Sequence, residues 1–370
     1  MTFVFVCSRL SGGGAERVAV NLANSLVDLG HTVIVFIRRE SQDSYELDSR
    51  VFRYTSGLPG FVGQILSLRR LIDKASADVV LAFTDVPNIV SYLAVKLSRV
   101  KPIFVPTVHT NLRARDKRLS NGVRFKIIHY LHKLACRYSD SVVSVSDGGR
   151  QALIDYYGVP EHQAVKIFNP VIDDYVKISE HKSVSDTLKV RLVAAGRLTE
   201  AKNYPLMFDA VKRLNEMHPG KYILDIYGDG ELEGALKEYA RQLDVSNIVN
   251  FKGFVRDFES RLSSYDIFVF SSDWEGFGNV LVEALCSGIP VISTDCPSGP
   301  REILADGKFG RLVPVGDVRA FCEAVEQEVR QPLDVCHVTL SKHLDQFRNG
   351  VVTQKYIDLV DHVQKVKRES

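Results

Sequence analysis

Short apolar strand patterns alternate with helical patterns along nearly the whole chain of 370 residues. A strand is expected at residues 3–7, a helix at 15–29 and a second strand at 31–37. The alternation restarts in the second half with a strand at 190–195 and a helix at about 204–217. Repeated strand–helix units form parallel sheets covered by helices on both faces, so the sequence predicts an α/β fold of doubly wound domains.

The two halves of the chain differ in charge, which supports a division into two domains. Residues 1–170 contain 22 Lys and Arg against 14 Asp and Glu, whereas the remainder contains 25 against 31. The polar, non-periodic stretch that follows predicts a linker at 171–187. We therefore expect a first domain at 1–170 and a second at 188–350.

The composition is that of a soluble globular protein, with 45% hydrophobic and 25% charged residues. No apolar run is long enough to cross a bilayer, and no charged leader precedes the strand at 3–7. We therefore expect a cytoplasmic site of action. The six cysteines include no close pair at metal-binding spacing, so we interpret them as reduced core thiols.

The stretch from Glu275 to Glu283 follows a buried strand pattern at 266–272 and opens into a helix expected at 280–286. A helix amino terminus at the carboxyl end of a parallel strand presents unpaired N–H groups and binds phosphate well. Gly278 allows the backbone to approach a ligand closely. The two glutamates could accept hydrogen bonds from sugar hydroxyls; the alternative is that they are ordinary loop and helix-surface carboxylates.

Other loops at strand ends also carry candidate ligand-binding residues. Gly12–Gly14 precede the first helix and suit either a phosphate loop or a simple tight turn. His109 ends a strand, where an open α/β sheet binds its ligands, although a lone histidine can equally be structural. Arg197 and Lys202 follow the first strand of the second half and together could neutralise a diphosphate.

The first glycine-rich loop differs from a dinucleotide-binding fingerprint. The three glycines are consecutive, and the second strand ends on Arg38 and Arg39 instead of an acidic residue. An acidic residue at that position would bind the ribose of a dinucleotide. The sequence therefore gives little support to a nicotinamide or flavin cofactor.

Residues 113–137 form the most basic segment of the chain. A single acid, Asp116, stands among eight cations: Arg113, Arg115, Lys117, Arg118, Arg124, Lys126, Lys133 and Arg137. Apolar residues recur at helical spacing at Val123, Ile127, Leu131 and Leu134. This pattern predicts a basic amphipathic helix that binds an anionic membrane or phosphorylated ligands; the alternative is that its apolar stripe packs on the core. One local patch does not predict a nucleic-acid partner.

Taken together, these motifs resemble the retaining nucleotide-sugar glycosyltransferases of family 4. That family has the GT-B architecture, in which two Rossmann-like domains face each other across a cleft. The resemblance covers nearly the whole chain and rests on five motifs in the family's order: Ser11–Arg17, Gly196–Leu198 with Lys202 and Asn203, Gly228–Gly230, Gly253–Val255, and the two glutamates at 275 and 283. The final segment, about 351–370, would be the helix that crosses back onto the first domain.

The resemblance implies a role for each matching position. Glu283 would bind the donor ribose, Glu275 would contact the transferred sugar, and His109 would hydrogen-bond that sugar in the transition state. The implied catalytic set is His109, Arg197, Lys202 and Glu275. The implied donor-binding set is Gly13, Gly14, Arg197, Lys202, Gly228, Phe254, Val255, Gly278, Asn279, Val280, Leu281 and Glu283. Gly278 departs from the family pattern, in which many members carry proline or another residue.

The activity implied is transfer of a hexose or N-acetylhexosamine, with retention, from a nucleotide sugar, expected to be a UDP-sugar. The acceptor would be a polyprenyl-diphosphate-linked or other saccharide in bacterial-type surface polysaccharide assembly. No metal or other cofactor is expected, because the chain contains no Asp-x-Asp and Arg197, Lys202 and helix dipoles would stabilise the leaving group. The basic segment would hold the enzyme at the cytoplasmic face of the inner membrane. Two alternatives stay open: a noncatalytic nucleotide-sugar-binding subunit and a GT-B UDP-sugar epimerase.

Overall fold

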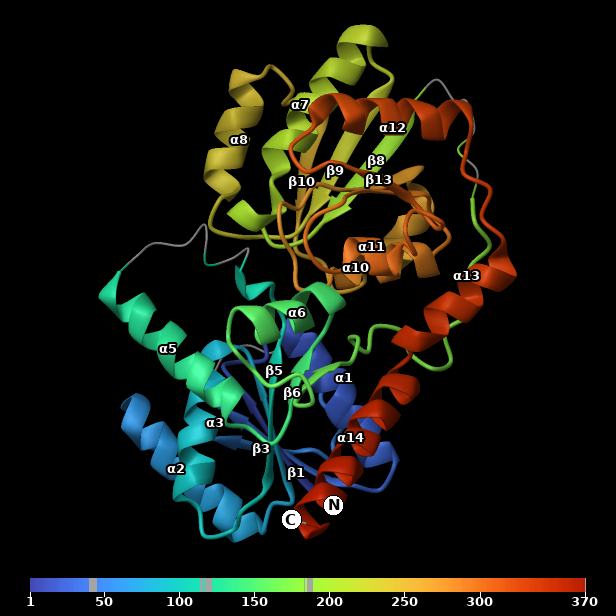
Figure 1. The fold of residues 1–370 in the computed structure, drawn as a ribbon. Helices are drawn as coiled ribbons and strands as arrows, with labels where there is room; N and C mark the ends of the chain where they lie inside the picture. The colour runs from blue at the N-terminus through green and yellow to red at the C-terminus, as the bar shows by residue number, and fades with distance from the viewer. Residues whose placement is uncertain (40–44, 114–115, 117–121, 183, 185–188, 370) are drawn as a thin grey trace. The chain divides into compact units, whose positions relative to one another are not determined.

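The computed structural model describes residues 1–39, 45–113, 116, 122–182, 184 and 189–369 (Figure 1). The chain divides into two units, Met1–Asp174 with Gln346–Ser370, and Tyr175–Asp345. The crossing at residues 174 and 175 falls inside the segment predicted as a linker. On its two sides, Val171 N donates to Phe347 O in the first unit, and Ser179 N donates to Cys286 O in the second. Much of that segment is therefore packed on one unit or the other.

The first unit contains a parallel sheet in the order β3-β2-β1-β4-β5-β6-β7. Its strands are β1 (Thr2–Cys7), β2 (Thr32–Ile37), β3 (Phe52–Thr55), β4 (Val79–Phe83), β5 (Ile103–Val108), β6 (Val142–Ser144) and β7 (Ala164–Lys166). In the centre, Val4 of β1 lies between Ile34 and Val80. The strand order reverses on either side of β1, and in such sheets ligands bind at the carboxyl ends of the strands around that point.

Helices cover both faces of this sheet. They are α1 (Gly14–Asp28), α2 (Gly60–Ala75), α3 (Asp85–Leu97), α5 (Val123–Arg137), α6 (Asp147–Asp155) and α14 (Asn349–Glu369). Phe3 and Phe5 pack with α1 and with Tyr356 of α14 on one face. Val4 and Val6 pack with α2 and α3 on the other face. The last helix of the chain thus completes the core of the first unit.

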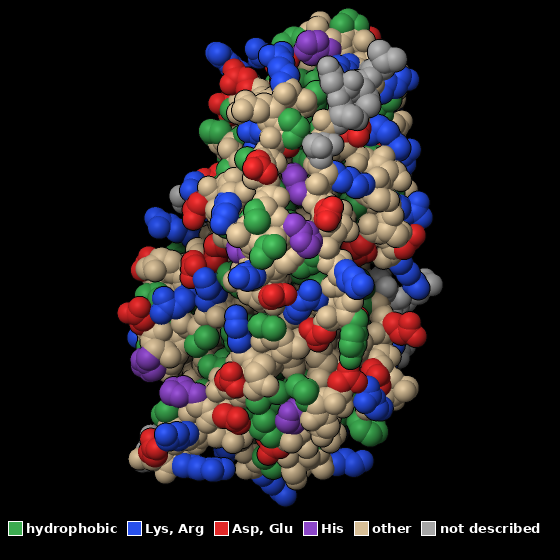
Figure 2. Space-filling view, turned by 90° about the vertical axis from the view of Figure 1, so that its right-hand side faces the viewer, with side chains coloured by type: hydrophobic (Ala, Val, Ile, Leu, Met, Phe, Trp, Pro, Cys, Tyr) green, Lys and Arg blue, Asp and Glu red, His purple; other side chains and the backbone are tan. Residues whose placement is uncertain are grey.

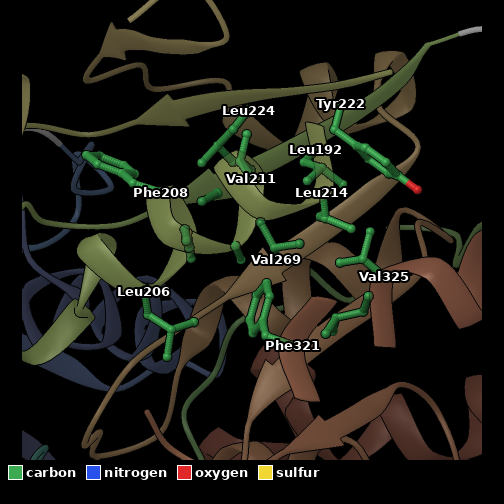
Figure 3. Close-up of a cluster of buried hydrophobic side chains, with 14 of the residues drawn as sticks. Leu192, Leu206, Phe208, Val211, Leu214, Tyr222, Leu224, Val269, Phe321 and Val325 are labelled. Atoms are coloured by element: carbon green, nitrogen blue, oxygen red, sulfur yellow. The ribbon is translucent and has the colours of Figure 1, made fainter. Parts of the chain in front are cut away.

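The second unit contains a parallel sheet in the order β10-β9-β8-β11-β12-β13. Its strands are β8 (Val190–Ala195), β9 (Tyr222–Tyr227), β10 (Val249–Gly253), β11 (Ile267–Phe270), β12 (Val291–Thr294) and β13 (Arg311–Val313). Its helices are α7 (Tyr204–Met217), α8 (Glu233–Gln242), α9 (Phe258–Arg261), α10 (Asn279–Cys286), α11 (Pro300–Ile303), α12 (Val318–Arg330) and α13 (His337–Leu344). Figure 3 shows Phe208 of α7, Leu224 and Val269 of the sheet and Phe321 of α12 in one buried cluster.

The predicted fold class, two doubly wound α/β domains, is confirmed. β8 and α7 have the predicted bounds. β5 ends at Val108, so His109 lies in the loop that follows it and not in the strand. The strands β3, β7 and β13 were not predicted, because each has only three or four residues and none carries a long apolar run.

Four of the six cysteines are buried. Cys7, Cys136, Cys296 and Cys322 are buried free thiols, as predicted, but Cys336 is exposed. On the face drawn in Figure 2, Lys and Arg side chains lie among Asp and Glu and do not gather in one field. In the described ranges, no helix is both long and apolar enough to span a membrane.

Backbone hydrogen bonds hold together the loops that follow β8, β9 and β10. Gly196 N donates to Tyr227 O at 3.0 Å, and Gly228 N donates to Gly253 O at 2.9 Å. A Cβ atom at Gly228 would lie 2.1 Å from Gly196 O. The close approach of these loops therefore requires a glycine at position 228.

We predict that Gly228→Ala lowers the free energy of unfolding by about 2–5 kcal/mol, because φ is +132° and the new methyl group meets a backbone carbonyl. Scanning calorimetry should show this as a lower Tm. The control is Gly234→Ala in α8, where nothing lies within 4 Å of the added methyl group. Alanine favours a helix over glycine, so the control should lose no stability. A wild-type Tm for Gly228→Ala would contradict the packing of these loops.

Candidate functional site

The predicted glutamate element forms the loop from β11 into α10. Gly278 adopts φ +99°, a left-handed conformation that favours glycine, directly before the first helical residue, Asn279. Glycine has no side chain to cap the helix, and Leu281 N donates to Gly278 O at 2.9 Å, so the backbone of Gly278 closes the first turn of α10 at the carboxyl edge of the sheet. Phe277 is buried, and its carbonyl lies against Gly299, where a Cβ would approach it to 1.8 Å. The buried Phe277 and its close contact with Gly299 therefore fix the conformation of this loop.

Lys202 and Glu275 form an ion pair inside the second unit. Their Nζ and Oε1 atoms are 2.5 Å apart, and the two side chains are only 17% and 14% exposed. Ser272 Oγ donates to the same carboxylate oxygen at 2.7 Å. Lys202 Nζ also lies 4.8 Å from the ring centroid of Phe270. A predicted phosphate cation and a predicted sugar-binding carboxylate are thus partners in this structure.

Hydrogen bonds between two loops create this pair. Ser271 Oγ donates to Lys202 O at 2.7 Å, and Asn203 Nδ2 donates to Asp273 Oδ1 at 2.8 Å. Asn203 adopts φ +42°, a conformation that asparagine tolerates better than most residues. The loop after β8 is therefore held against the loop after β11. Ser271 and Ser272 were not predicted as site residues; their only sequence signal is their position at a strand end.

The other predicted residues of the second unit lie on loops at the same sheet edge. Arg197 is exposed directly after β8, Gly228 follows β9, and Phe254 is exposed after β10. Val255 is half-buried next to Phe254. Glu283 lies one turn inside α10 and is also half-buried. This edge of the sheet thus carries cations, a helix amino terminus, an exposed aromatic ring and carboxylates.

The first unit holds the remaining predicted residues. Gly12 adopts φ +64°, and Gly13 precedes α1, which begins at Gly14. His109 lies at the end of β5, and its ring stacks on Phe83 with centroids 5.8 Å apart. The structure therefore assigns Gly13, Gly14 and His109 to one unit and the other predicted residues to the second.

Burial keeps the imidazole of His109 neutral. It lowers the pKa of His109 from 6.5 to about 4, and a hydrogen bond with Asn169 opposes this only in part. The Nε2 atom is 2.9 Å from Thr107 Oγ1, which donates its own proton to Ala82 O. Thr107 must then accept from His109, so Nε2 carries the proton and Nδ1 is the acceptor.

The basic segment is only partly described. Arg115, Lys117 and Arg118 lie outside the described residues. Helix α5 buries His132, Ala135 and Cys136, which form its packed face. Val123, Ile127 and Tyr130 are 74%, 55% and 60% exposed. The alternative that the predicted apolar stripe packs on the core is therefore wrong for Val123 and Ile127.

Comparison with known proteins places both halves of the chain in one group of enzymes. Residues 12–175 match the family model Glycosyltransferase Family 4, and residues 177–342 match Glycosyl transferases group 1. The lipopolysaccharide core biosynthesis glycosyltransferase LpsE of Rhizobium meliloti is 27% identical over 360 residues, covering 94% of this chain and 96% of the relative. A Campylobacter jejuni N-acetylgalactosaminyltransferase, named for a diphospho-undecaprenol-linked acceptor, is 24% identical and covers 87% and 88%.

Solved structures share the fold at lower identity. The apo lipopolysaccharide outer core galactosyltransferase WaaB has a TM-score of 0.73 at 19% identity, over 98% of this chain and 99% of that one. Anabaena Alr3699/HepE, in complex with UDP and glucose, has a TM-score of 0.79 at 18% identity, over 98% and 100%. With two parallel-sheet domains that match these structures and family models for each half, the chain belongs to the family 4 glycosyltransferases of GT-B fold.

Proposed function

We propose that this glycosyltransferase moves a hexose or N-acetylhexosamine, with retention, from a UDP-sugar to a lipid-linked saccharide. The observation that carries the proposal is the Lys202–Glu275 pair beside the uncapped amino terminus of α10. It combines a cation for phosphate, a carboxylate for sugar hydroxyls and helix amides at one sheet edge. Relatives named for lipopolysaccharide and undecaprenol-linked glycans support the acceptor class, and a similar structure that contains UDP supports the donor.

In the proposed complex the diphosphate replaces Glu275 as the partner of Lys202. Arg197 and the amides of Asn279 and Val280 supply the remaining donors to the phosphate oxygens, since the predicted amide of Leu281 already donates to Gly278 O at 2.9 Å. Glu283 accepts from the ribose hydroxyls, and the exposed ring of Phe254 with Val255 lies against the base. Glu275, released from Lys202, then accepts from hydroxyls of the transferred sugar.

The reaction proposed is front-face displacement. The bond from the anomeric carbon to the diphosphate breaks, and the negative charge that develops on UDP is stabilised by Arg197 and Lys202. The acceptor hydroxyl attacks from the same face, and its proton passes to the departing phosphate oxygen. We propose that no metal is needed, because these cations and helix amides supply the positive charge. His109 is neutral, because burial lowers its pKa, and it would bring no charge to the reaction.

We predict that replacement of Glu283 and replacement of Glu275 have different effects on UDP binding and turnover. Glu283→Ala should weaken UDP binding roughly 10- to 100-fold, the scale of losing hydrogen bonds to a charged group. Glu275→Ala should not weaken UDP, because it releases Lys202, yet it should lower kcat by roughly 10²–10³. Calorimetry with UDP and turnover on a polyprenyl-diphosphate-linked glycan measure the two effects.

The control for both glutamates is Glu238→Ala on the exposed face of α8, which should change neither quantity. Equal losses of UDP affinity in the two variants would contradict the separate roles. UDP binding without any transfer would favour a noncatalytic subunit, and conversion of the UDP-sugar without an acceptor would favour an epimerase.

The stability of the protein should depend on pH through His109. Its pKa is about 4 when folded and near 6.5 when unfolded, so the unfolded chain binds more protons between these values. The free energy of unfolding should therefore fall as the pH is lowered from 7 to 4, by at most about 3 kcal/mol from this residue. His109→Gln should remove that part of the slope in denaturant unfolding measured at each pH.

The matched control is the exposed His162→Gln, which should leave the wild-type slope in place. If His109→Gln and wild type lose stability in parallel below pH 6, then His109 is not buried in the neutral form.

We also propose that α5 docks on an anionic membrane. Val123, Ile127 and Tyr130 stand four and three residues apart, so they share one exposed face of the helix, and Arg124 and Lys126 are exposed beside them. Apolar side chains flanked by cations suit the boundary between headgroups and acyl chains. Each Lys or Arg near the surface contributes about 1 kcal/mol, so four could hold the protein reversibly.

Changing Arg115, Lys117, Arg118 and Lys126 together to Gln should abolish sedimentation with vesicles of anionic phosphatidylglycerol, and added salt should release the wild type. Ile127→Ser with Val123→Ser should weaken binding without changing its dependence on salt. Met217→Ser, an exposed apolar residue of the second unit, serves as the control. Turnover of a short soluble acceptor should survive in every variant. Vesicle binding that persists in the quadruple variant, or that ignores salt, would reject electrostatic docking.

A further inference from the structure

Arg38, directly after β2, is a half-buried arginine whose side-chain partners among the described residues are Gln64 and Ser8. Its Nε donates to Gln64 Oε1 at 2.7 Å, and its Nη1 lies 3.4 Å from Ser8 Oγ. Both partners are neutral. Within the part of the chain that the structure describes, no acidic side chain forms an ion pair with Arg38. Arg311, the inward-facing arginine of the second unit, instead pairs with Glu328 at 2.5 Å.

Gln64 orients the guanidinium without neutralising it. Gln64 is buried on α2, and its Nε2 also reaches Arg38 O at 3.4 Å, so one amide holds the side chain and the backbone of Arg38. A guanidinium has five N–H donors. The contacts to Gln64 and Ser8 use two of these donors, and the contact to Ser8 is long, at 3.4 Å. The remaining Nη donors form a fork of the geometry that binds a phosphate or carboxylate in two places.

The surroundings of Arg38 add positive charge. Burial, and then the neighbouring Arg39, lower the pKa of Arg38 to about 10, so both effects oppose its charge. Arg39 is exposed, and its N–H donates to Ser8 O at 3.0 Å. Arg9, which follows Ser8 in the loop after β1, is also exposed. A bound anion would relieve the unfavourable charge that no described side chain compensates.

The position of Arg38 points to a ligand and not to a general surface role. It stands with Ser8 at the carboxyl ends of β1 and β2, beside the strand where the sheet order reverses. If residue 38 served only to link β2 to α2, a neutral side chain at position 38 would be sufficient. Alternatively, an acidic residue at position 64 would neutralise the arginine. A charge that is held in place and has no ion-pair partner among the described residues is typical of binding sites.

We propose that Arg38, with Arg39 beside it, binds an anionic group, phosphate or carboxylate, of the saccharide acceptor. The assignment to the acceptor rests on the proposed function, in which the donor diphosphate takes the cations Arg197 and Lys202 of the other unit. Gln64 and Ser8 are positioning residues that orient the guanidinium of Arg38.

The decisive variant is Gln64→Glu, which keeps the side-chain shape and gives Arg38 a counterion in place. Both binding experiments use the full chain with Arg197→Ala and Lys202→Ala, so that the proposed donor site does not contribute. Inorganic phosphate and acetate are titrated separately while the Nε resonance of Arg38 is followed by NMR, assigned by its loss in Arg38→Lys. We expect a saturable shift with at least one anion, and affinity lowered roughly 10- to 100-fold by Gln64→Glu.

Anion affinity, and not stability, separates this proposal from a structural role. In either case Gln64→Glu should keep or raise Tm, because a buried cation gains a partner; only a binding site also loses anion affinity. Arg69→Gln is the control, since Arg69 lies on the same helix as Gln64 and has its own partner, Asp73, at 3.5 Å. Anion affinity that is unchanged in Gln64→Glu, or an Arg38 resonance that responds to neither anion, overturns the site.

The two ions distinguish the source of the anion. Tighter phosphate binding indicates a phosphate-bearing acceptor, and tighter acetate binding indicates an acidic sugar. In the otherwise wild-type enzyme, Gln64→Glu should raise KM for the acceptor about 10-fold while kcat and UDP affinity hold. The titrations need neither UDP nor turnover, so they succeed or fail independently of the proposed function. An enzyme that transfers sugar normally while Arg38 ignores both ions would retain that function and lose this site.

Discussion

Parallel strands can be joined only by a crossover, and this constraint sets where chemistry can occur in each unit. Every strand of both sheets runs in one direction, so every loop that leaves a strand emerges at the same edge. Residues far apart in sequence, such as Lys202 and Glu275, meet there without any long excursion of the chain. The apolar cores beneath, with Phe208 and Phe321 in one unit and Phe3 and Phe5 in the other, hold these edges rigid.

The Lys202–Glu275 pair gives the second unit a site that is neutralised by its own residues. Two charged side chains that are mostly removed from water would each be costly alone, and together they satisfy one another with help from Ser272. A diphosphate can take Lys202 only if Glu275 gains another partner. Sugar hydroxyls are such partners, so in the proposed complex a donor that carries both groups replaces both halves of the pair. UDP alone replaces only one half.

Much of the fold could be predicted from the sequence, because its strongest elements carry long patterns. β8 and α7 have apolar residues at the right period over their whole length, and Gly278 marks a turn that needs a left-handed residue. β3 is short, and its Phe52 is exposed, so no buried pattern identifies it. Helical periodicity revealed the apolar residues of α5 but not which face packs, since that depends on neighbours such as α3. The contact of Lys202 with Glu275 depends on two loops whose hydrogen bonds no local pattern encodes.

The two candidate anion sites differ in how they treat their own charge, and the difference bears on catalysis. Arg38 is held by neutral groups and offers its charge to a ground-state ligand, which favours binding. In the proposed complex Lys202 must leave Glu275 first, which lowers its affinity for a ground-state diphosphate. In the proposed reaction, charge grows on the diphosphate as the sugar departs, and the exchange becomes more favourable with it. In that proposal Glu275, already released from Lys202 in the donor complex, contacts a sugar that gains positive charge. A site whose two charged side chains are already paired with each other therefore stabilises the transition state more than the bound donor.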